Sequence, residues 1–460
     1  MAKKTPIEKL SKPNVTFSEL NDALSKISPT GAIIEDSIYA KIDEWIPTGS
    51  YILNAAMSGS LFGGMPNRRS LLFAGSEGSG KTFLTLSIVR NAQAMDYFPI
   101  YYDSEGSIDI DFVKRLGIDT SKFRIENIST VEEFATLTAK LNETIEDIRK
   151  AEKTPPKVMV ILDSLGNLSS IKEKADTTSG SDKRDMTKQQ AIRRTFRVIA
   201  NDFAKNGIPF VLTGHVYAKI GSYIPGDEIS GGGGGKYSAS IIFVLTKSKL
   251  TDKDSEEHVK KIGLETAKVG IVVTVHPYKQ RFARPIKVQI HIPFYKKPNP
   301  YVGLEKFVNW ETCGVVRGKT HNQKEYEKLK DSEKKRCFNF EGWSMVEETD
   351  KSGNTVLVKK PNGKIWVEPR DTSKYLVCKH LGGEISLAEL YTDKVFTDEV
   401  LHKLDENIIK RTFQLPNIES LEDLAEITGD LLDDTEMGDV NIDVDDTALG
   451  VEDLDLPHID

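Results

Sequence analysis

The chain has 460 residues, 38% hydrophobic and 28% charged, with a formal net charge of −7, the composition of a globular protein large enough for a substantial core. No apolar run approaches the ~18 residues of a membrane-spanning helix, and no apolar signal segment follows the first residues, so we expect no membrane attachment. Cys313, Cys337 and Cys378 are far apart and lack metal-ligand spacing, which argues against a disulfide framework or zinc site and favours reduced thiols in the cytoplasm.

An amphipathic helix is predicted near the amino terminus. Thr16-Phe-Ser-Glu19 has the sequence of a capping box, and Phe17, Leu20, Leu24 and Ile27 then fall on one helical face. Residues 28–44 lack periodicity, so we interpret residues 1–44 as a helix and a linker. Such a helix usually packs on its own core.

Residues 75–82 read Gly-Ser-Glu-Gly-Ser-Gly-Lys-Thr, between a predicted strand at Ser70–Ala74 and a predicted helix at Phe83–Met95. The glycines let backbone N–H groups approach phosphate oxygens, and the helix amino terminus adds unpaired N–H groups. Lys81 is expected to reach the β- and γ-phosphates, and the Thr82 hydroxyl to bind Mg²⁺. A chance glycine-rich turn fits this context poorly. The residues expected to hold the nucleotide are Gly75, Ser76, Glu77, Gly78, Ser79, Gly80, Lys81, Thr82 and Phe83.

Two carboxylates are expected at the same edge of the sheet as this loop. The apolar run Lys157–Asp163 ends in an aspartate, and Pro99–Asp103 is a second predicted strand with Glu105 just beyond it. Asp163 is expected to hold Mg²⁺ through water, and Glu105 to act as general base near the γ-phosphate. The alternatives are an ordinary strand end for Asp163 and a helix-capping or surface carboxylate for Glu105.

Several segments together resemble the RecA-type recombinases. The segments are Ile46–Ser50, Gly63–Met65, Asp103–Asp119, Leu162–Leu168 and Asn299–Leu304. The last two are closer to the phage branch of the family than to the bacterial branch. The resemblance covers residues 40–310 well and the next hundred loosely. It implies an α/β fold, with a RecA-like P-loop ATPase core at residues 45–310, a mostly parallel central sheet, and ATP and Mg²⁺ as cofactors.

The resemblance also assigns roles around the nucleotide. Glu105 becomes the base, Asp109 lies near the adenine amino group and Phe112 covers the ring, although a core aromatic is an equally good interpretation of Phe112. Phe210–His215 is a further apolar strand, and His215 becomes the sensor of the γ-phosphate through its imidazole. We therefore expect Lys81, Glu105 and His215 to be the catalytic residues.

Two polar segments without clear periodicity lie at about residues 169–188 and 216–236. Irregular loops that combine cations, aromatic rings and glycines suit single-stranded nucleic acid, and the resemblance makes them the two DNA-binding loops. Without it, flexible surface loops are the better interpretation. The second segment directly follows His215, so the γ-phosphate could position this DNA-binding loop through His215. The residues expected at DNA are Lys172, Lys174, Lys183, Arg184, Lys188, Tyr217, Lys219, Tyr223, Gly231, Gly232, Gly233, Gly234, Gly235 and Lys236.

Three further cations, Lys279, Arg281 and Arg284, lie where the family places residues that cross the subunit interface to the neighbour's ATP. A His276-Pro277 pair interrupts the family pattern here. The sequence does not choose among the three cations, and exposed basic residues in a turn are nearly as good an interpretation.

Residues 311–416 predict a small α+β domain. Phe338–Glu368 alternates as strands around two expected hairpin turns, at Lys351–Asn354 and Pro361–Gly363, and helical periodicity returns at Ser386–Phe413.

An acidic tail follows at residues 417–460. No Lys or Arg follows Arg411, and residues 419–460 hold sixteen carboxylates, so the rest of the chain has a formal charge of about +9. This composition predicts disorder. The tail either solubilises the protein, or competes with DNA for basic surfaces and docks replication partners.

These features predict an ATP-dependent recombinase that forms helical filaments of its own copies on single-stranded DNA. It would exchange strands with homologous duplex DNA in the cytoplasm of the cell, the host cell if a phage encodes it. Within the filament, the amino-terminal helix is expected to pack on the adjacent subunit. A single-strand-binding protein, a mediator and a helicase are candidate partners. The alternatives are a hexameric replicative helicase or other DNA-stimulated ATPase, and a non-catalytic DNA-binding or mediator protein.

Overall fold

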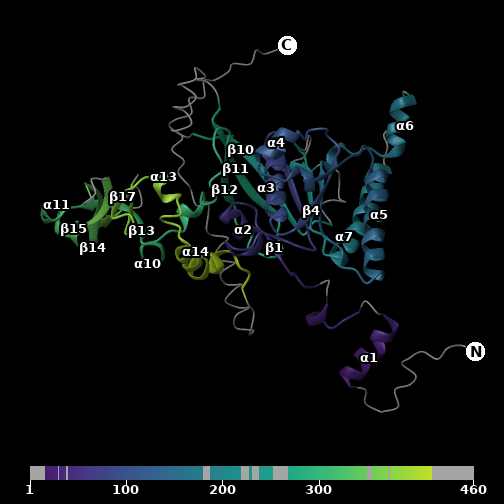
Figure 1. The fold of residues 1–460 in the computed structure, drawn as a ribbon, viewed down its shortest axis with the longest axis horizontal. Coiled ribbons are helices and arrows are strands. Elements are labelled where there is room, and N and C mark those ends of the chain that lie inside the picture. Colours follow the sequence, from purple (N-terminus) through teal and green to yellow (C-terminus); the bar gives the residue numbers. More distant parts are fainter. Residues whose placement is uncertain are drawn as a thin grey trace, which may run out of the picture. The chain divides into compact units, whose positions relative to one another are not determined.

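An eight-stranded sheet forms the centre of the fold (Figure 1). The computed structural model describes residues 16–28, 31–37, 40–179, 187–218, 227–229, 238–251, 268–349, 355–370, 373 and 375–416. In order across the sheet, the strands are β12 (Val288–Pro293), β11 (Gly270–Lys279), β10 (Ile241–Lys249), β3 (Ser70–Gly75), β7 (Phe210–Gly214), β6 (Lys157–Asp163), β4 (Tyr97–Asp103) and β5 (Arg124–Asn127). The pairings from β10 to β5 are parallel, and β11 and β12 join antiparallel at one edge. The expected α/β fold with a mostly parallel sheet is therefore confirmed.

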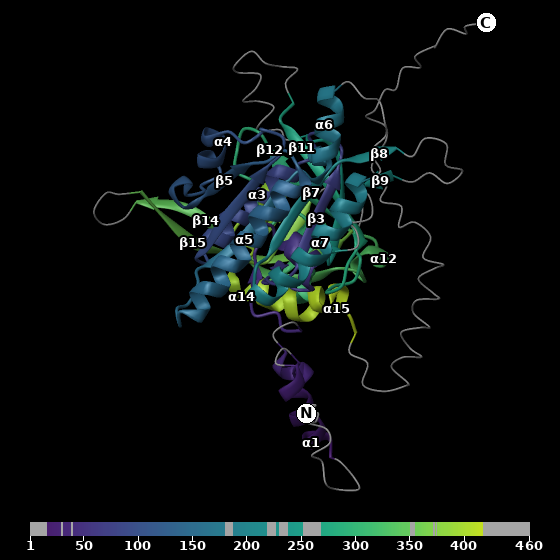
Figure 2. The ribbon, with the colours of Figure 1, turned by 90° about the vertical axis from the view of Figure 1, so that its right-hand side faces the viewer.

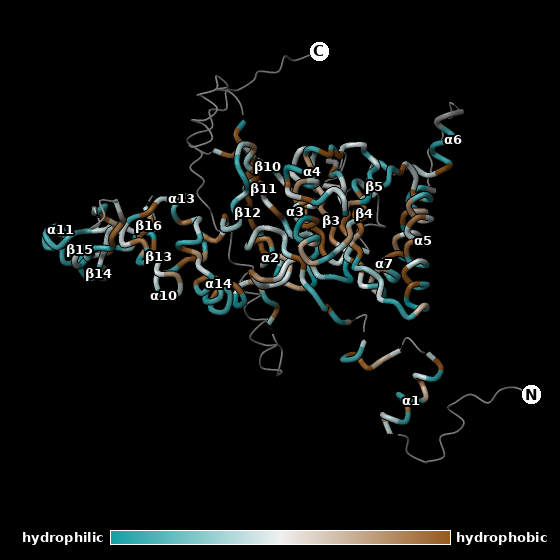
Figure 3. Tube along the Cα trace, viewed as in Figure 1, coloured by the Kyte–Doolittle hydropathy of each residue, from teal (hydrophilic) through white to brown (hydrophobic). Residues whose placement is uncertain are grey.

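Helices cover both faces of this sheet, because alternate residues along each strand point to opposite sides. Leu71 and Phe73 of β3 join a core that includes α2 (Tyr51–Ser58) and α3 (Lys81–Gln93). Leu72 and Ala74 join a second core with α5 (Val131–Lys150) and α7 (Thr187–Asn206). Figure 2 shows α5 and α7 side by side over the strands, and Figure 3 shows β3 as largely hydrophobic. The result is a three-layered arrangement of helix, sheet and helix.

Strand β6 illustrates how the sequence positions the site. Its residues from Val158 to Asp163 are all buried, as expected for a strand covered on both faces. The apolar run ends at Asp163, so the carboxylate stands at the edge where the carboxyl ends of the parallel strands meet. The predicted strand before the phosphate loop and the helix after it are found within two residues of their expected ends.

Helix α1 (Phe17–Ile27) begins with the predicted capping box, in which Glu19 N donates to Thr16 Oγ1 at 3.3 Å and Thr16 N donates to Glu19 Oε2 at 3.0 Å. Its apolar stripe is exposed: Phe17 is 73% accessible and Ile27 is 49% accessible. Within the described part of the chain, this stripe is therefore uncovered. The short strands β1 (Trp45–Ile46) and β2 (Met65–Pro66) then pair and lead into the core.

Two segments expected to be irregular contain regular structure. Residues Ile171–Ser179 form helix α6, which Ser170 and Glu173 cap reciprocally, with Glu173 N donating to Ser170 Oγ at 2.9 Å. The Ser-x-x-Glu pattern that forms this cap was present in the sequence. In the second segment, β8 (Val216–Ala218) pairs antiparallel with β9 (Asp227–Ile229). The prediction of two wholly irregular segments was therefore wrong for these residues.

A second, antiparallel sheet has five strands in the order β14 (Phe338–Thr349), β15 (Thr355–Pro369), β13 (Val315–His321), β16 (Leu376–Cys378) and β17 (Gly383–Ile385). The short helix α10 (Trp310–Cys313) precedes β13, and α11 (Gln323–Glu327) and α12 (Asp331–Lys334) lie between β13 and β14. Thr349 pairs with Thr355, so the chain reverses around the first expected turn, which lies outside the described residues.

The second expected turn, at Pro361–Gly363, was wrong. Strand β15 continues through it, with Gly342 opposite Gly363 and Trp343 opposite Pro361. Asn362 is thus the extra residue of a bulge, and Gly363 adopts a φ of 73°. The same glycine that favours a turn also accommodates the backbone of a bulge within a continuous strand.

The chain then returns to the core around the large sheet through α13 (Leu387–Leu390), α14 (Asp398–Leu404), the π-helical turn Asp405–Ile409 and α15 (Lys410–Phe413). The buried Asp405 accepts hydrogen bonds from Ser60 Oγ and Leu61 N, both at 2.7 Å. Both sheets lie within one structural unit, which ends at Gln414. The expected division at residues 310–311 stays a prediction, and the predicted acidic tail at 417–460 lies outside the described residues. None of the described helices is long and apolar enough to cross a membrane.

Candidate nucleotide site

A cleft of about 790 Å³ opens at the carboxyl edge of the large sheet. Its polar part is lined by the phosphate loop, by the last residue of β6 and by residues that follow β4 and β7. They include Lys81, Thr82, Glu105, Asp163 and His215. The chain therefore brings together all the residues that the sequence suggested for catalysis and metal binding.

The phosphate loop connects β3 to α3. Gly78 and Gly80 have φ angles of 65° and 91°, a region that other residues rarely adopt. A Cβ at Gly80 would also lie 2.7 Å from the Ile292 side chain. Lys81 Nζ donates to the carbonyl oxygens of Gly75 and Ser76, at 3.0 and 2.9 Å, and burial lowers the pKa of Lys81. The loop thus has the backbone that phosphate binding requires, with its lysine already inside it.

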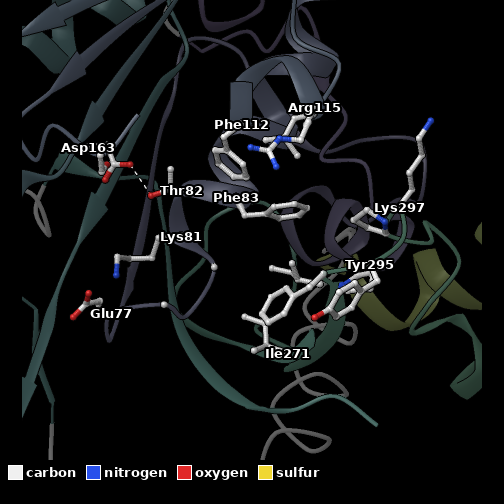
Figure 4. Close-up of a pocket in the computed structure, with 18 of the residues that line it drawn as sticks. Glu77, Lys81, Thr82, Phe83, Phe112, Arg115, Asp163, Ile271, Tyr295 and Lys297 are labelled. Carbon is white, nitrogen blue, oxygen red and sulfur yellow. Dashed lines mark hydrogen bonds between the residues drawn. The ribbon is translucent and has the colours of Figure 1, made fainter. Parts of the chain in front are cut away.

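Asp163 and Thr82 form the candidate magnesium position (Figure 4). Thr82 Oγ1 donates to Asp163 Oδ2 at 2.8 Å. Two more hydroxyls, those of Tyr101 and Thr213, donate to the same carboxylate. Hydroxyl and carboxylate oxygens are the hard donors that Mg²⁺ selects, and the ion usually completes its shell with phosphates and water. The residues therefore fit Mg²⁺. Tyr101 and Thr213 reach Asp163 because their strands, β4 and β7, are the two neighbours of β6 in the sheet.

Glu105 is held by two side chains. Ser164 Oγ donates to Glu105 Oε1 at 2.5 Å, and His215 Nε2 lies 3.0 Å from the same oxygen. Burial alone would raise the pKa of Glu105, but the hydrogen bonds from Ser164 and His215 and the nearby positive charge outweigh burial and lower it. Glu105 is therefore poised as a deprotonated carboxylate at neutral pH. The sequence did not single out Ser164, although it directly follows Asp163.

The other end of the cleft is apolar and aromatic (Figure 4). Phe83, Phe112 and Tyr295 line it, with Arg115 beside them. Aromatic rings next to a phosphate loop suit a planar base. Arg115 and Tyr295 were not anticipated, because neither belongs to the motifs that identify the loop. Asp109 is absent from this lining, and its carboxylate accepts a hydrogen bond from Phe112 N at 2.9 Å at the start of α4 (Ile110–Arg115). Its expected adenine contact stays a prediction.

The three candidate interface cations lie away from this cleft. Lys279 ends β11, and burial together with the charge of Arg281 lowers its pKa. Arg281 and Arg284 are exposed, and Arg284 N donates to Phe413 O at 2.6 Å. Cations that act on a neighbouring subunit need not line their own cleft, so the choice among these three stays open.

The expected DNA-binding residues are placed in part. Lys172 and Lys174 lie on α6, where Lys174 Nζ donates to Ser129 Oγ at 2.9 Å. Lys188 lies on α7 with Nζ 3.6 Å from Glu173 Oε2, and Tyr217 lies in β8. The remaining residues fall outside the described part of the chain: Lys183, Arg184, Lys219, Tyr223, Gly231, Gly232, Gly233, Gly234, Gly235 and Lys236.

Comparison with known families decides the classification. Residues 19–294, more than half of the chain, match the family model of the RecA N-terminal domain. The chain belongs to the RecA family. The resemblance that the motifs predicted is therefore confirmed, and the RecA domain covers the whole eight-stranded sheet.

Individual relatives of this RecA-family chain come from a phage and from bacteria. The recombination and repair protein of Enterobacteria phage T4 is 29% identical over 240 residues, which is 51% of this chain and 59% of that protein. The RecA protein of Treponema denticola is 26% identical over 267 residues, 57% of this chain and 58% of its own length. That of Helicobacter pylori is 28% identical over 240 residues, 51% and 64% respectively. The chain thus spans less than two thirds of each relative.

Proposed function

We propose that this protein is a DNA-dependent ATPase that polymerises on single-stranded DNA and exchanges strands with homologous duplex DNA. The observation that carries the proposal is the joining of two kinds of site. The nucleotide residues Lys81, Thr82, Asp163 and Glu105 meet in one cleft, and His215 joins that cleft to the segment at 216–236. Family membership and the name of the phage relative, a recombination and repair protein, support recombination and repair as the setting.

Hydrolysis would transfer the γ-phosphoryl group of ATP to water. Glu105 would accept a proton from the attacking water while the bond from the γ-phosphorus to the bridging oxygen breaks, leaving ADP and phosphate. Lys81 would turn from the loop carbonyls to the phosphate oxygens and stabilise their negative charge. Thr82 and Asp163 would hold Mg²⁺, which, when bound, neutralises charge on the phosphates.

DNA coupling would run through His215. Its imidazole contacts Glu105 at 3.0 Å, and the next residue begins β8 in the second expected DNA-binding segment. A γ-phosphate beside Glu105 would bias the position of His215 and therefore of that segment. By linkage, DNA bound to the segment would change the affinity for ATP by the same factor.

Filament formation is supported by helix α1. Its apolar stripe, formed by Phe17, Leu20, Leu24 and Ile27, is exposed, and burying it against another apolar surface would be favourable. A neighbouring copy would supply that cover, and residues 28–44 would serve as the tether. A single-strand-binding protein, a mediator and a helicase are the proposed further partners, and the cytoplasm is the proposed compartment.

A strand-exchange assay tests the whole proposal. The protein is incubated with circular single-stranded DNA, ATP and Mg²⁺, and then with a homologous or a heterologous linear duplex. We expect joint molecules with the homologous duplex alone. Electron microscopy of the same mixtures distinguishes helical filaments from the closed rings of a hexameric helicase. Closed rings without joint molecules would contradict the proposed recombinase and favour the hexameric helicase.

Glu105→Gln tests the catalytic assignment, because the amide keeps the shape of the side chain but cannot accept the proton. We expect DNA-stimulated ATP hydrolysis to fall by about 100-fold or more, with single-stranded DNA binding retained. Glu143→Gln, an exposed substitution on α5, is the matched control and should leave turnover unchanged. Full turnover of Glu105→Gln would remove Glu105 from the mechanism.

A further inference from the structure

A second lysine touches the phosphate loop from the neighbouring strand. Lys247, on β10, donates from Nζ to the carbonyl oxygen of Glu77 at 2.6 Å. A Cβ built on Gly78 would lie 3.0 Å from the same Nζ. Neither the loop motif nor the other sequence patterns drew attention to Lys247, which lies more than 160 residues further along the chain.

The register of the sheet explains why Lys247 arrives there. Strand β10 runs parallel to β3, and the last paired residues are Leu245 and Gly75. A Cβ at Gly75 would lie 2.7 Å from Leu245 O, so the start of the loop packs directly on β10. Strand β10 continues to Lys249, beyond the end of β3, alongside the loop. Because side chains alternate along a strand, Lys247 points to the same side as Leu245 and meets the loop two residues after Gly75.

Two lysines therefore hold three consecutive loop carbonyls. Lys81 binds those of Gly75 and Ser76, and Lys247 binds that of Glu77. In a trans peptide the C=O and the following N–H point in opposite directions. Fixing the Glu77 carbonyl against Lys247 consequently directs the Gly78 N–H away from β10, the orientation in which a loop N–H is free to meet an anion.

We propose that Lys247 is a positioning residue for nucleotide binding, which keeps the phosphate loop in its binding conformation through the Glu77 carbonyl. The proposal rests on the proposed function of the loop as a nucleotide site. When Lys81 turns to the phosphates, it leaves part of its contacts with Gly75 and Ser76. Lys247 has no such second task in the loop and holds the Glu77 peptide in both states.

This assignment also gives the 216–236 segment a second connection to the cleft. His215 precedes the segment and contacts Glu105, and Lys247 lies on the strand that follows it and contacts Glu77. The two contacts reach different parts of the nucleotide site. One reaches the proposed general base, Glu105, and the other reaches the backbone of the phosphate loop.

Nucleotide affinity measured without DNA tests the proposal. Binding of a fluorescent ADP analogue with Mg²⁺ is titrated for the unaltered chain, Lys247→Met, Lys247→Arg and Lys249→Met. Lys249 is the matched control, because it lies on the same strand and the same side, is exposed, and has the same charge. We expect Lys247→Met to weaken binding about tenfold, the factor that corresponds to ~1.4 kcal/mol, and Lys249→Met and Lys247→Arg to stay within about twofold.

Steady-state hydrolysis separates positioning from general damage to the fold. In Lys247→Met, KM for ATP should rise about tenfold while kcat at saturating ATP stays within about twofold. The reason is that the Lys247 contact would strengthen binding of the ground state and of the transition state equally. Should Lys247→Met fail to fold, Lys247→Gln serves the same comparison. Equal affinities for Lys247→Met and Lys249→Met would overturn the proposal and leave the nucleotide site standing. Absence of nucleotide binding by the unaltered chain would refute that site, and the proposal with it.

Discussion

Two buried carboxylates, one in each sheet, are held in different ways. Asp163 in the large sheet is 1% accessible, and Glu368 in the five-stranded sheet is fully inaccessible. Asp163 accepts hydrogen bonds from three neutral hydroxyls, those of Thr82, Tyr101 and Thr213. Glu368 is surrounded by three basic side chains: His321 at 3.2 Å, Arg370 at 2.8 Å and Arg336 at 3.5 Å.

The difference separates the carboxylate that we propose to hold Mg²⁺ from one whose role is structural. The hydrogen-bond partners of Asp163 are neutral, and positive charge acts on it from Lys81 nearby. A bound cation would gain from this carboxylate, and a hydroxyl such as that of Thr82 could turn to the cation as well. The charge of Glu368 is already compensated by the guanidinium groups of Arg336 and Arg370. Burial of an acid is therefore a poor guide to function until the charge of its partners is known.

Asp163→Asn should give the largest effect. The amide keeps the size of the side chain but removes the charge that would hold Mg²⁺, so we expect ATP turnover to fall by about 100- to 1,000-fold. The melting temperature should change little, since Thr82 and Tyr101 can still donate to the amide oxygen, and the Thr213 hydroxyl can accept from the amide nitrogen. Asp147→Asn, an exposed change on α5, is the control for turnover. Retention of a tenth of the activity would place Asp163 among the structural carboxylates.

Glu368→Gln should have the opposite pattern. Removing one member of a buried ionic group leaves its partners unsatisfied, but Arg336 and Arg370 are 62% and 46% exposed and recover hydration. We therefore expect a loss of about 1–3 kcal/mol in the free energy of unfolding, below the full cost of breaking a buried pair. Urea denaturation measures this loss, and nucleotide affinity should be unchanged. A loss of nucleotide binding would break the comparison.

The pH dependence of stability sharpens the same contrast. Burial alone would raise the pKa of Glu368, but Arg370 and His321 outweigh it and hold the pKa below the ordinary value of 4.5. A carboxyl with a lowered folded-state pKa stabilises the fold above the unfolded pKa and loses this contribution as pH falls through the folded pKa. The stability difference between the unaltered chain and Glu368→Gln should therefore be constant near neutrality and shrink below pH 4.5. A difference that grows on acidification would contradict this sign.

Thr213→Val should give the smallest effect. It removes one of the three hydroxyls on Asp163 and keeps the shape of the side chain. Because two donors remain, we expect the Mg²⁺ concentration at half-maximal ATPase activity to change by about threefold, with a stability loss of about 1 kcal/mol. Magnesium titrations of turnover measure the first and urea denaturation the second. An effect as large as that of Asp163→Asn would mean that Thr213 has a direct role in the site.

The placement of the candidate nucleotide-site residues could be predicted from sequence, because they belong to short, strongly patterned segments. A buried strand fixes where the residues at its end and just beyond it stand. Asp163 ends β6, the phosphate loop follows β3, and His215 follows β7. The residues that contact these side chains could not be predicted, because they do not belong to the same local segments. Ser164 and Thr213 act through the register between strands, and Lys247 through a pairing between distant parts of the chain, which no local pattern encodes.

Elsewhere the sequence misled where one residue type serves two structures. Gly363 favours a turn, yet it lies beside the bulge at Asn362 within the continuous strand β15. The pairing of β14 with β15 continues there because it satisfies more backbone hydrogen-bonding groups than a turn would. The polar segment that holds α6 shows no apolar stripe, so its periodicity failed to indicate a helix, whereas its capping residues did. Caps are local and survive where hydrophobic patterning is absent.

The return of the chain to the core has a practical consequence for dividing the protein. The aromatic rings of Tyr301 and Phe396 stack with centroids 5.1 Å apart, and Phe413 packs against Phe307 at 5.6 Å. The five-stranded sheet is thus an insertion between two parts of one hydrophobic core, rather than an appendage at its end. Ending the chain near residue 310 would strip that core of its last helices. Excising residues 315–386 and joining the flanks by a short flexible linker would instead keep those helices in the chain, at the cost of Val315, Leu376, Cys378 and Ile385, which belong to the same buried core.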